Sequence, residues 1–292
     1  MIRYPVTDTG LRQLIDEAAP GWLGRARTRT DKFRRVGRYQ EQSGIWSEVK
    51  PVYSKLQHNK CGYCERKLAD PERGIIEHDL EHFRPKSDVK AWPAPAAKAK
   101  FKLTFSTGAA ERRGYYLLPY HPWNYLVACK ACNSALKSSA FPVAAVRNTA
   151  AEDPWSMAEE KPFLVYPLGE LDSDPATILT FIGNLPVPVK RKGHAHRRAR
   201  VVIAFFELDT REDLLEERAK WIVALWIALR LRATGTPDDQ AQANEAILQY
   251  TSPYAPHSRC ITAFHELTQR DPAAAARVVQ HMREYLRSKT PT

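Results

Sequence analysis

Four of the five cysteines fall into two pairs with the same internal spacing. Two residues separate Cys61 from Cys64 and Cys129 from Cys132, and 64 residues lie between the pairs. Two such pairs can present four thiolates tetrahedrally to one Zn²⁺ at about 2.3 Å. Because four protein ligands leave no open position, we expect a structural zinc that contributes to folding. Cys260 has no partner in this pattern and is interpreted as a small core residue.

The stretch from the first cysteine pair to just past the second also carries side chains suited to hydrolysis of a phosphodiester. It contains two Glu-His dipeptides, Glu77-His78 and Glu81-His82, and Asn133 follows the last cysteine. Such hydrolysis needs a base for water and a cation for the phosphate. Histidine, with an ordinary pKa of about 6.5, suits a general base at neutral pH. Glu81 and Asn133 offer the oxygen ligands that hard cations such as Mg²⁺ prefer.

The order of these motifs resembles that of the HNH, or ββα-metal, endonucleases. That order is CxxC, Glu-His-x-x-Pro, Asn-x-Leu, and CxxCN with a lysine close behind. More narrowly, Glu-His-Phe-Arg-Pro-Lys (81–86), Trp-Asn-Tyr-Leu (123–126) and Cys-x-x-Cys-Asn (129–133) are similar to the PtuB-like nucleases of Septu antiphage and retron-linked systems. The motifs cover about residues 58–140, and a weaker likeness continues towards Asp174 and the helix opened near Thr210.

The resemblance implies a role for each residue in these motifs. His82 is the general base, preferred over its rival His78 because Pro85 follows His82 by three residues. Glu81 and Asn133 hold the catalytic cation, and the asparagine favours Mg²⁺ or Mn²⁺ over the softer ions that histidine ligands bind. The remaining expected site residues are Asn124, which would brace the loop of His82, the catalytic lysine Lys137, and the nucleic-acid contacts Arg84 and Lys86.

The chain is strongly basic. It has 44 Lys and Arg against 33 Asp and Glu, a formal net charge of +11 and a pI of about 9.4. Basic side chains bind polyanions by replacing the counterions of the phosphates, although a solvated basic surface is the alternative interpretation. Residues 25–38 carry seven basic side chains. We expect Arg34 and Arg35 among them to contact nucleic acid, with DNA favoured.

Periodicity and turn residues predict an α+β fold in three parts. The expected parts are a helical, basic lead-in (1–58), a zinc-stabilised ββα-metal nuclease core (59–140) and a mainly α-helical C-terminal domain (141–292). Strands are expected within residues 75–84, 115–118 and 163–166, a helix from Cys132, a capping box at Thr210, and helix starts at Pro237 and Asp271. The sequence shows neither a signal peptide nor a transmembrane segment, which favours a soluble, cytoplasmic protein without membrane partners.

The motifs predict a metal-dependent HNH endonuclease. The resemblance implies an effector of antiphage defence that works with a PtuA-like ATPase. The chain itself contains no GxxxxGK[ST] sequence, so the ATPase is expected to be a separate protein. Three alternatives stay open: a noncatalytic zinc fold that binds nucleic acid or protein, a standalone restriction-type HNH enzyme, and a structural scaffold.

Overall fold

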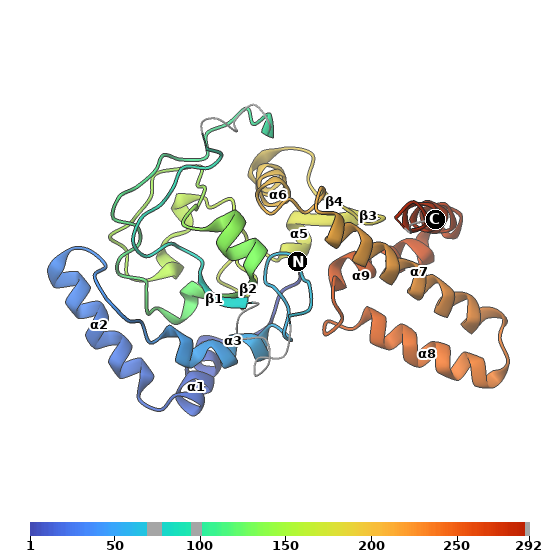
Figure 1. Ribbon diagram of the computed structural model, residues 1–292, viewed down its shortest axis with the longest axis horizontal. Helices are drawn as coiled ribbons and strands as arrows, with labels where there is room; N and C mark the ends of the chain where they lie inside the picture. The colour runs from blue at the N-terminus through green and yellow to red at the C-terminus, as the bar shows by residue number, and fades with distance from the viewer. Residues whose placement is uncertain (69–77, 95–100, 290–292) are drawn as a thin grey trace. The chain divides into compact units, whose positions relative to one another are not determined.

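The computed structural model describes residues 1–68, 78–94 and 101–289. Contacts divide the chain into two compact units. One unit contains Arg3–Tyr63 and Leu68–Pro175, and it holds Glu81, His82, Asn124 and Asn133. The other contains Ala176–Thr292 together with the short pieces Met1–Ile2 and Cys64–Lys67. The first unit mixes helices with a strand pair, the second is mainly helical, and Figure 1 labels the strands and most of the α-helices.

The motif unit begins with helices, as expected for residues 1–58. Its elements are α1 (Asp8–Ala18), α2 (Trp22–Val36), η1 (Trp46–Val49), α3 (Lys50–Leu56), β1 (His78–His82), η3 (Pro122–Asn124), β2 (Tyr125–Cys129), η4 (Ala131–Lys137), η5 (Pro154–Ser156) and η6 (Ala158–Glu160). The lead-in helices belong to the same compact unit as the strands, and so do residues 141–175.

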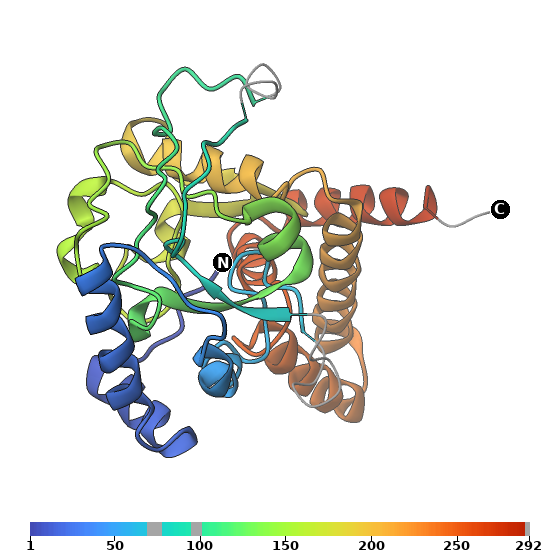
Figure 2. The ribbon, with the colours of Figure 1, turned by 60° about the vertical axis from the view of Figure 1, so that its left-hand side comes forward.

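Two strands and a short helix form the centre of the motif unit. β1 and β2 pair antiparallel, with His82 opposite Tyr125 and His78 opposite Cys129. Figure 2 shows the two strands side by side and η4 following β2. Every residue of β2 is buried, and α3 packs against this strand. A single residue, Lys130, joins β2 to η4, so the helix starts where the strand pair ends.

Two of the expected strands are absent from the described residues. Residues 115–118 form a turn, and 163–166 form no strand although all four are buried. The second run is bounded by Pro162 and Pro167, which lack the N–H that a ladder needs. Its side chains instead fill the core, where the Tyr166 hydroxyl donates to the Tyr125 carbonyl at 2.8 Å. Residues 75–77 of the first expected strand lie outside the described residues.

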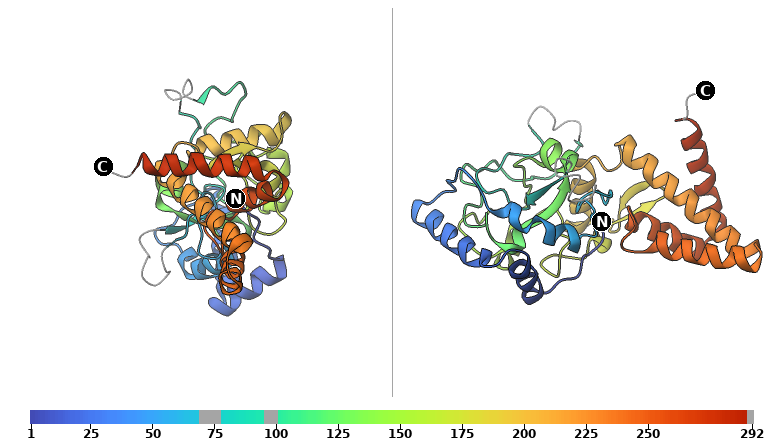
Figure 3. Two further views of the ribbon diagram at one scale, coloured as in Figure 1. Left: turned by 90° about the vertical axis from the view of Figure 1, so that its right-hand side faces the viewer. Right: turned by 60° about the horizontal axis from the view of Figure 1, so that its bottom comes forward.

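The second unit is mainly helical. Its elements are α5 (Pro175–Ile178), β3 (Leu179–Ile182), β4 (Leu185–Pro188), α6 (Gly193–Phe205), α7 (Glu212–Thr234), α8 (Pro237–Thr251), α9 (Ser258–Arg270) and α10 (Pro272–Arg287). Figure 3 shows α7 and α8 side by side as an antiparallel pair. Ile222 and Leu225 of α7 belong to the buried core, and Trp221 and Trp226 pack against it, which agrees with their interpretation as core residues.

Helix starts at Pro237 and Pro272 are as expected, but the capping box lies elsewhere. α7 begins at Glu212 with no side-chain capping bond from Arg211, and the Asp213 carboxylate accepts from the Arg211 guanidinium instead. The box forms at α8, where the Thr236 hydroxyl accepts from the Asp239 amide and the Asp239 carboxylate accepts from the Thr236 amide. The prediction of a box at Thr210 was therefore wrong.

None of the helices in the described part of the chain has a stretch long and apolar enough for a membrane span.

Candidate functional site

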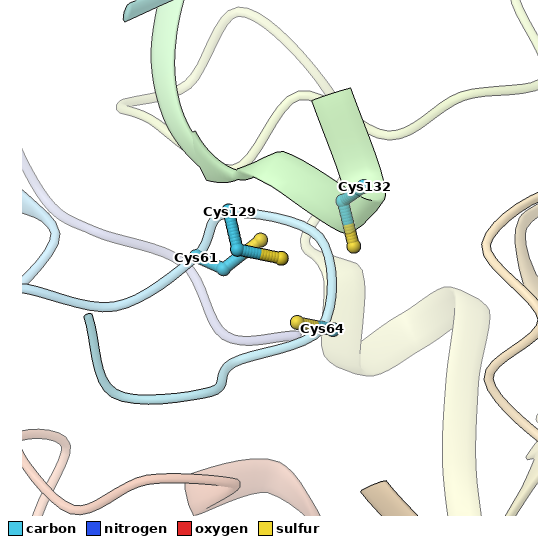
Figure 4. Close-up of side chains that lie close together, drawn as sticks. All are labelled: Cys61, Cys64, Cys129 and Cys132. Atoms are coloured by element: carbon cyan, nitrogen blue, oxygen red, sulfur yellow. The ribbon is translucent and has the colours of Figure 1, made fainter. Parts of the chain in front are cut away.

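The two cysteine pairs meet in space. The ligand atoms of Cys61, Cys64, Cys129 and Cys132 all lie within 4.8 Å of one another, and all four residues are buried. Figure 4 shows the four sulfurs converging. Tetrahedral thiolates at about 2.3 Å from zinc stand about 3.8 Å apart, so a small closure would complete such a site. The cluster could hold a zinc ion, as the spacing predicts.

Gln57 holds the first cysteine pair against β2. Its fully buried amide donates to the carbonyls of Lys60 and Val127 at 3.0 and 2.9 Å, and its oxygen accepts from the Val127 amide at 2.7 Å. The amide of Gly62 also donates to the Val127 carbonyl at 2.9 Å. These bonds join segments about 70 residues apart in sequence. No feature of the sequence near Gln57 indicates this role.

One cleft of about 470 Å³ contains the three residues at the centre of the predicted site. Glu81, His82 and Asn133 all line it, because β1 supplies the first two and η4 supplies the third. The other lining residues are Trp46, Ser47, Lys50, Asp79, Leu80, Pro85, Lys86, Ser87, Ser138 and Ser139. The rival base His78 is 1% exposed and does not line the cleft, and Glu77 lies outside the described residues.

His82 is oriented by one hydrogen bond and two aromatic rings. Its Nε2 lies 3.1 Å from the carbonyl oxygen of Pro119, and the rings of Trp46 and Tyr125 contact its imidazole nearly perpendicularly. A carbonyl oxygen only accepts, so Nε2 carries the proton and Nδ1 is the basic nitrogen. Burial holds the pKa of His82 well below its usual value, and the positive charges of Lys86 and Lys137 act in the same direction.

Asn124 ties together the backbone on both sides of His82. Its oxygen accepts from the Arg84 amide at 2.8 Å, and its nitrogen donates to the carbonyls of Arg84 and Leu118 at 3.0 Å. The first bonds fix the turn after β1, and the last fixes the segment that leads to Pro119. The side chain is fully buried. These are the bracing bonds expected of Asn124; its importance for catalysis stays a prediction.

Glu81 and Lys137 form a buried ion pair. The Lys137 side chain is 0% exposed, and its ammonium donates to the Glu81 carboxylate and, at 3.0 Å, to the His82 carbonyl. Burial raises the pKa of Glu81, and Lys137 opposes that rise. The lysine expected to take part in catalysis therefore holds the strand end that carries His82, and its ammonium is not in the open cleft.

Asn133 contacts a carboxylate that sequence reasoning missed. Its amide nitrogen donates to Asp79 at 3.0 Å, and Lys130 donates to both oxygens of Asp79 at 2.7 Å. A signal for Asp79 was present, because residues i and i+2 of a strand share one face and Glu81 was already assigned to the site.

Of the four expected nucleic-acid contacts, only Lys86 lines the cleft. Its ammonium lies 4.4 Å from the centre of the Trp46 ring, and burial lowers its pKa. On α2, Arg34 donates to both oxygens of Glu152 at 2.6 and 2.7 Å, whereas Arg35 is exposed. Neither of these arginines lines the cleft.

Arg84 was expected to contact nucleic acid, and the structure corrects this prediction. It is 3% exposed, its guanidinium donates to Glu160 at 3.0 Å, and it lies over the rings of Phe83, Tyr115 and Phe141. A side chain enclosed in this way cannot reach a phosphate, so Arg84 has a structural role. The sequence did not show this, because its partner Glu160 is 76 residues away.

The chain is similar in sequence to a curated protein. It is 28% identical over 172 residues to the Septu protein PtuB of Bacillus mycoides (strain KBAB4), an overlap that covers 59% of this chain and 50% of that protein. The chain thus spans about half the length of this relative. No protein-family profile and no solved structure matches the chain. The similarity supports a relationship to the Septu protein PtuB.

Proposed function

We propose that this protein is a metal-dependent endonuclease of the HNH type that hydrolyses phosphodiester bonds of nucleic acid, with DNA as the favoured substrate. The observation that carries the proposal is the shared cleft, which is lined by a neutral, oriented imidazole, an asparagine and a carboxylate. The order of the motifs along the chain supports the same conclusion.

His82 is the base in this proposal. Because Nε2 is held by the Pro119 carbonyl, Nδ1 takes the proton from the attacking water. Lys86 and Lys50 line the same cleft and provide positive charge for the phosphate. The oxygen ligands of the cleft would hold Mg²⁺ or Mn²⁺, which when bound would stabilise the charge that develops on the leaving oxygen. Asn124 and the Glu81–Lys137 pair keep His82 in position.

The relative's name suggests a biological setting. We propose that the protein belongs to a Septu-type antiphage system and that a PtuA-like ATPase is its partner. The similarity to the Septu protein PtuB supports this setting.

A nuclease assay on wild type and His82→Ala tests the proposal. The assay is run with Mg²⁺ or Mn²⁺, both with and without the ATPase. Wild-type protein should cleave DNA when the ATPase is present, and His82→Ala should lose about 100- to 10,000-fold in rate while still binding DNA. His78→Ala is the matched control, because that histidine lies on the same strand outside the cleft. Equal cleavage by wild type and His82→Ala would exclude His82 as the base.

A noncatalytic zinc fold that binds nucleic acid is the second candidate. One observation favours it: among the described residues, the cysteines form the only group of three or more His, Cys, Asp or Glu side chains close enough to share a metal ion. This candidate predicts DNA binding without cleavage under every metal and partner condition. A standalone restriction-type enzyme, by contrast, predicts full cleavage without any ATPase.

A further inference from the structure

The two carboxylates of the cleft differ in what they neutralise. Glu81 accepts from Lys137, whose side chain is 0% exposed. If the Glu81 carboxylate turned towards a cation, it would leave a buried ammonium without its counter-charge and next to a second positive charge. Removing one partner of a buried ion pair is strongly destabilising. Glu81 is therefore poorly suited to ligate a metal ion, although its place in the motif suggested that role.

The Asp79 carboxylate does not neutralise a buried charge. Its side chain is 32% exposed, and the Lys130 ammonium that donates to it belongs to a side chain that is 48% exposed. Pairs exposed to this degree contribute little to stability, and Lys130 can turn to water when a cation replaces it. Asp79 lies on the same face of β1 as Glu81 and also lines the cleft.

Asn133 connects Asp79 to the other side of the cleft. Its amide nitrogen donates to the Asp79 carboxylate at 3.0 Å, so its oxygen is the atom left to meet a cation. One carboxylate from β1 and one amide oxygen from η4 are a donor set for a hard divalent cation that keeps several water molecules. The residues of the cleft thus fit the cation through Asp79 and not through Glu81.

We infer that Asp79, together with Asn133, holds the divalent cation of the cleft. In this arrangement Glu81 and Lys137 are a positioning pair, which fixes the end of β1 and with it His82. The inference deepens the proposed function and rests on it for the kind of cation.

Binding of Mn²⁺, followed by electron paramagnetic resonance, tests this assignment without any need for cleavage. The protein is first saturated with zinc, because the soft thiolates of the cysteine cluster prefer that ion. Asp79→Asn should weaken Mn²⁺ binding at least about tenfold, a loss in the range seen for residues that support metal ligands. Asp88→Asn is the matched control, because its carboxylate accepts from Ser87 and Ser139 but does not line the cleft.

The positioning role of Glu81 needs a variant that folds. Glu81→Gln alone leaves Lys137 buried and charged, whereas the double variant Glu81→Gln with Lys137→Met removes both charges. The double variant should bind Mn²⁺ within about threefold of wild type. It should also be less active than wild type, because the strand end that carries His82 has lost its bond from Lys137.

The Mn²⁺ binding of Asp79→Asn and of the double variant, taken together, tests whether Asp79 or Glu81 is the ligand. Loss of Mn²⁺ binding in the double variant with retention in Asp79→Asn would identify Glu81 as the ligand and overturn the inference. Retention in both would place the cation elsewhere and would also overturn it, and loss in both would contradict the purely positioning role of Glu81. If wild type binds Mn²⁺ through Asp79 but cleaves no nucleic acid, the inference holds and the proposed nuclease function fails.

Discussion

At the scale of single residues, His82 combines a fixed tautomer with a depressed pKa. Burial is the largest cause of the depression, and Lys86 and Lys137 add to it. Unfolding returns the pKa to about 6.5, so the unfolded chain binds the proton more readily than the folded one. The stability that His82 contributes is therefore fully present above about pH 6.5 and falls as the pH drops below that value.

The same depression predicts the pH dependence of cleavage. A general base must be neutral, so the rate should stay level down to about pH 6.5 and decline only in more acid solution. Lys86→Met removes one of the charges that lower the pKa, and the decline should then begin at a higher pH than in wild type. Cleavage rates at saturating metal measure the pH at which activity declines in each protein. An NMR titration of the His82 ring measures its pKa. A wild-type decline that begins above pH 6.5 would contradict the environment described for His82.

Arg84 and Glu160 make a second prediction about single residues. Their side chains are 4% and 1% exposed, so loss of either partner leaves a buried charge. Glu160→Gln or Arg84→Met should lower the free energy of unfolding by about 3–5 kcal/mol, whereas the double variant should recover most of that loss. Urea unfolding measures the free energy of unfolding of the two single variants and of the double variant. Additive losses in the double variant would mean that the two charges do not stabilise each other.

Local motifs predicted which residues meet in the cleft, but not their long-range partners. Glu81, His82 and Asn133 were chosen from their chemistry and from the resemblance of the motifs to a known family, and they line one cleft. The partners that decide what each side chain can do were not visible in the sequence, because Lys137 lies 56 residues from Glu81 and Glu160 lies 76 residues from Arg84. A charged side chain next to a motif can be a ligand or a buried pair, and only tertiary contacts distinguish the two.

At the scale of elements, two threonines precede helices, but only one of them takes part in a capping box. The box expected at Thr210 is absent, and the one at Thr236 is formed. The Thr236 hydroxyl accepts from the Asp239 amide at the start of α8, and the Asp239 carboxylate accepts from the Thr236 amide. By contrast, α7 starts two residues after Thr210 and has no side-chain capping bond. Thr236→Ala should therefore cost about 1 kcal/mol of stability, and Thr210→Ala should stay within about 0.5 kcal/mol of wild type. Thermal or urea unfolding of the two variants gives this comparison. Equal losses would show that the hydroxyl of Thr236 adds nothing to α8.

Elements with a strong local pattern were predictable, and most strands, which depend on pairing, were not. The helical lead-in and the starts of α8 and α10 follow from periodicity and from Pro at the first turn. The hairpin of β3 and β4 was missed, although Gly183-Asn184 between two apolar runs is a turn signal, and Gly183 has a positive φ of 58°. The run 163–166 was apolar enough for a strand but is bounded by prolines.

At the scale of the whole molecule, the cysteine cluster is the longest-range contact between chain segments that the sequence predicted. A bound ion would join two chain segments separated by 64 residues, and closure of a loop of that length restricts the unfolded chain. Gln57 and Val127, 70 positions apart, already make hydrogen bonds across a similar separation. Ligation by four thiolates would add free energy that exists only in the folded state.

Zinc content and stability together test this contribution. The purified chain should contain one equivalent of zinc, and Cys61→Ser or Cys132→Ser should remove it, because each deletes one of the four converging ligands. Cys260→Ser is the matched control, since this buried cysteine lies in the core of the helical unit. Loss of the ion should lower the melting temperature by on the order of 10 °C or more. Elemental analysis and thermal unfolding with and without a chelator provide the measurements, and a chelator that removes zinc without lowering the melting temperature would show that the cluster does not stabilise the fold.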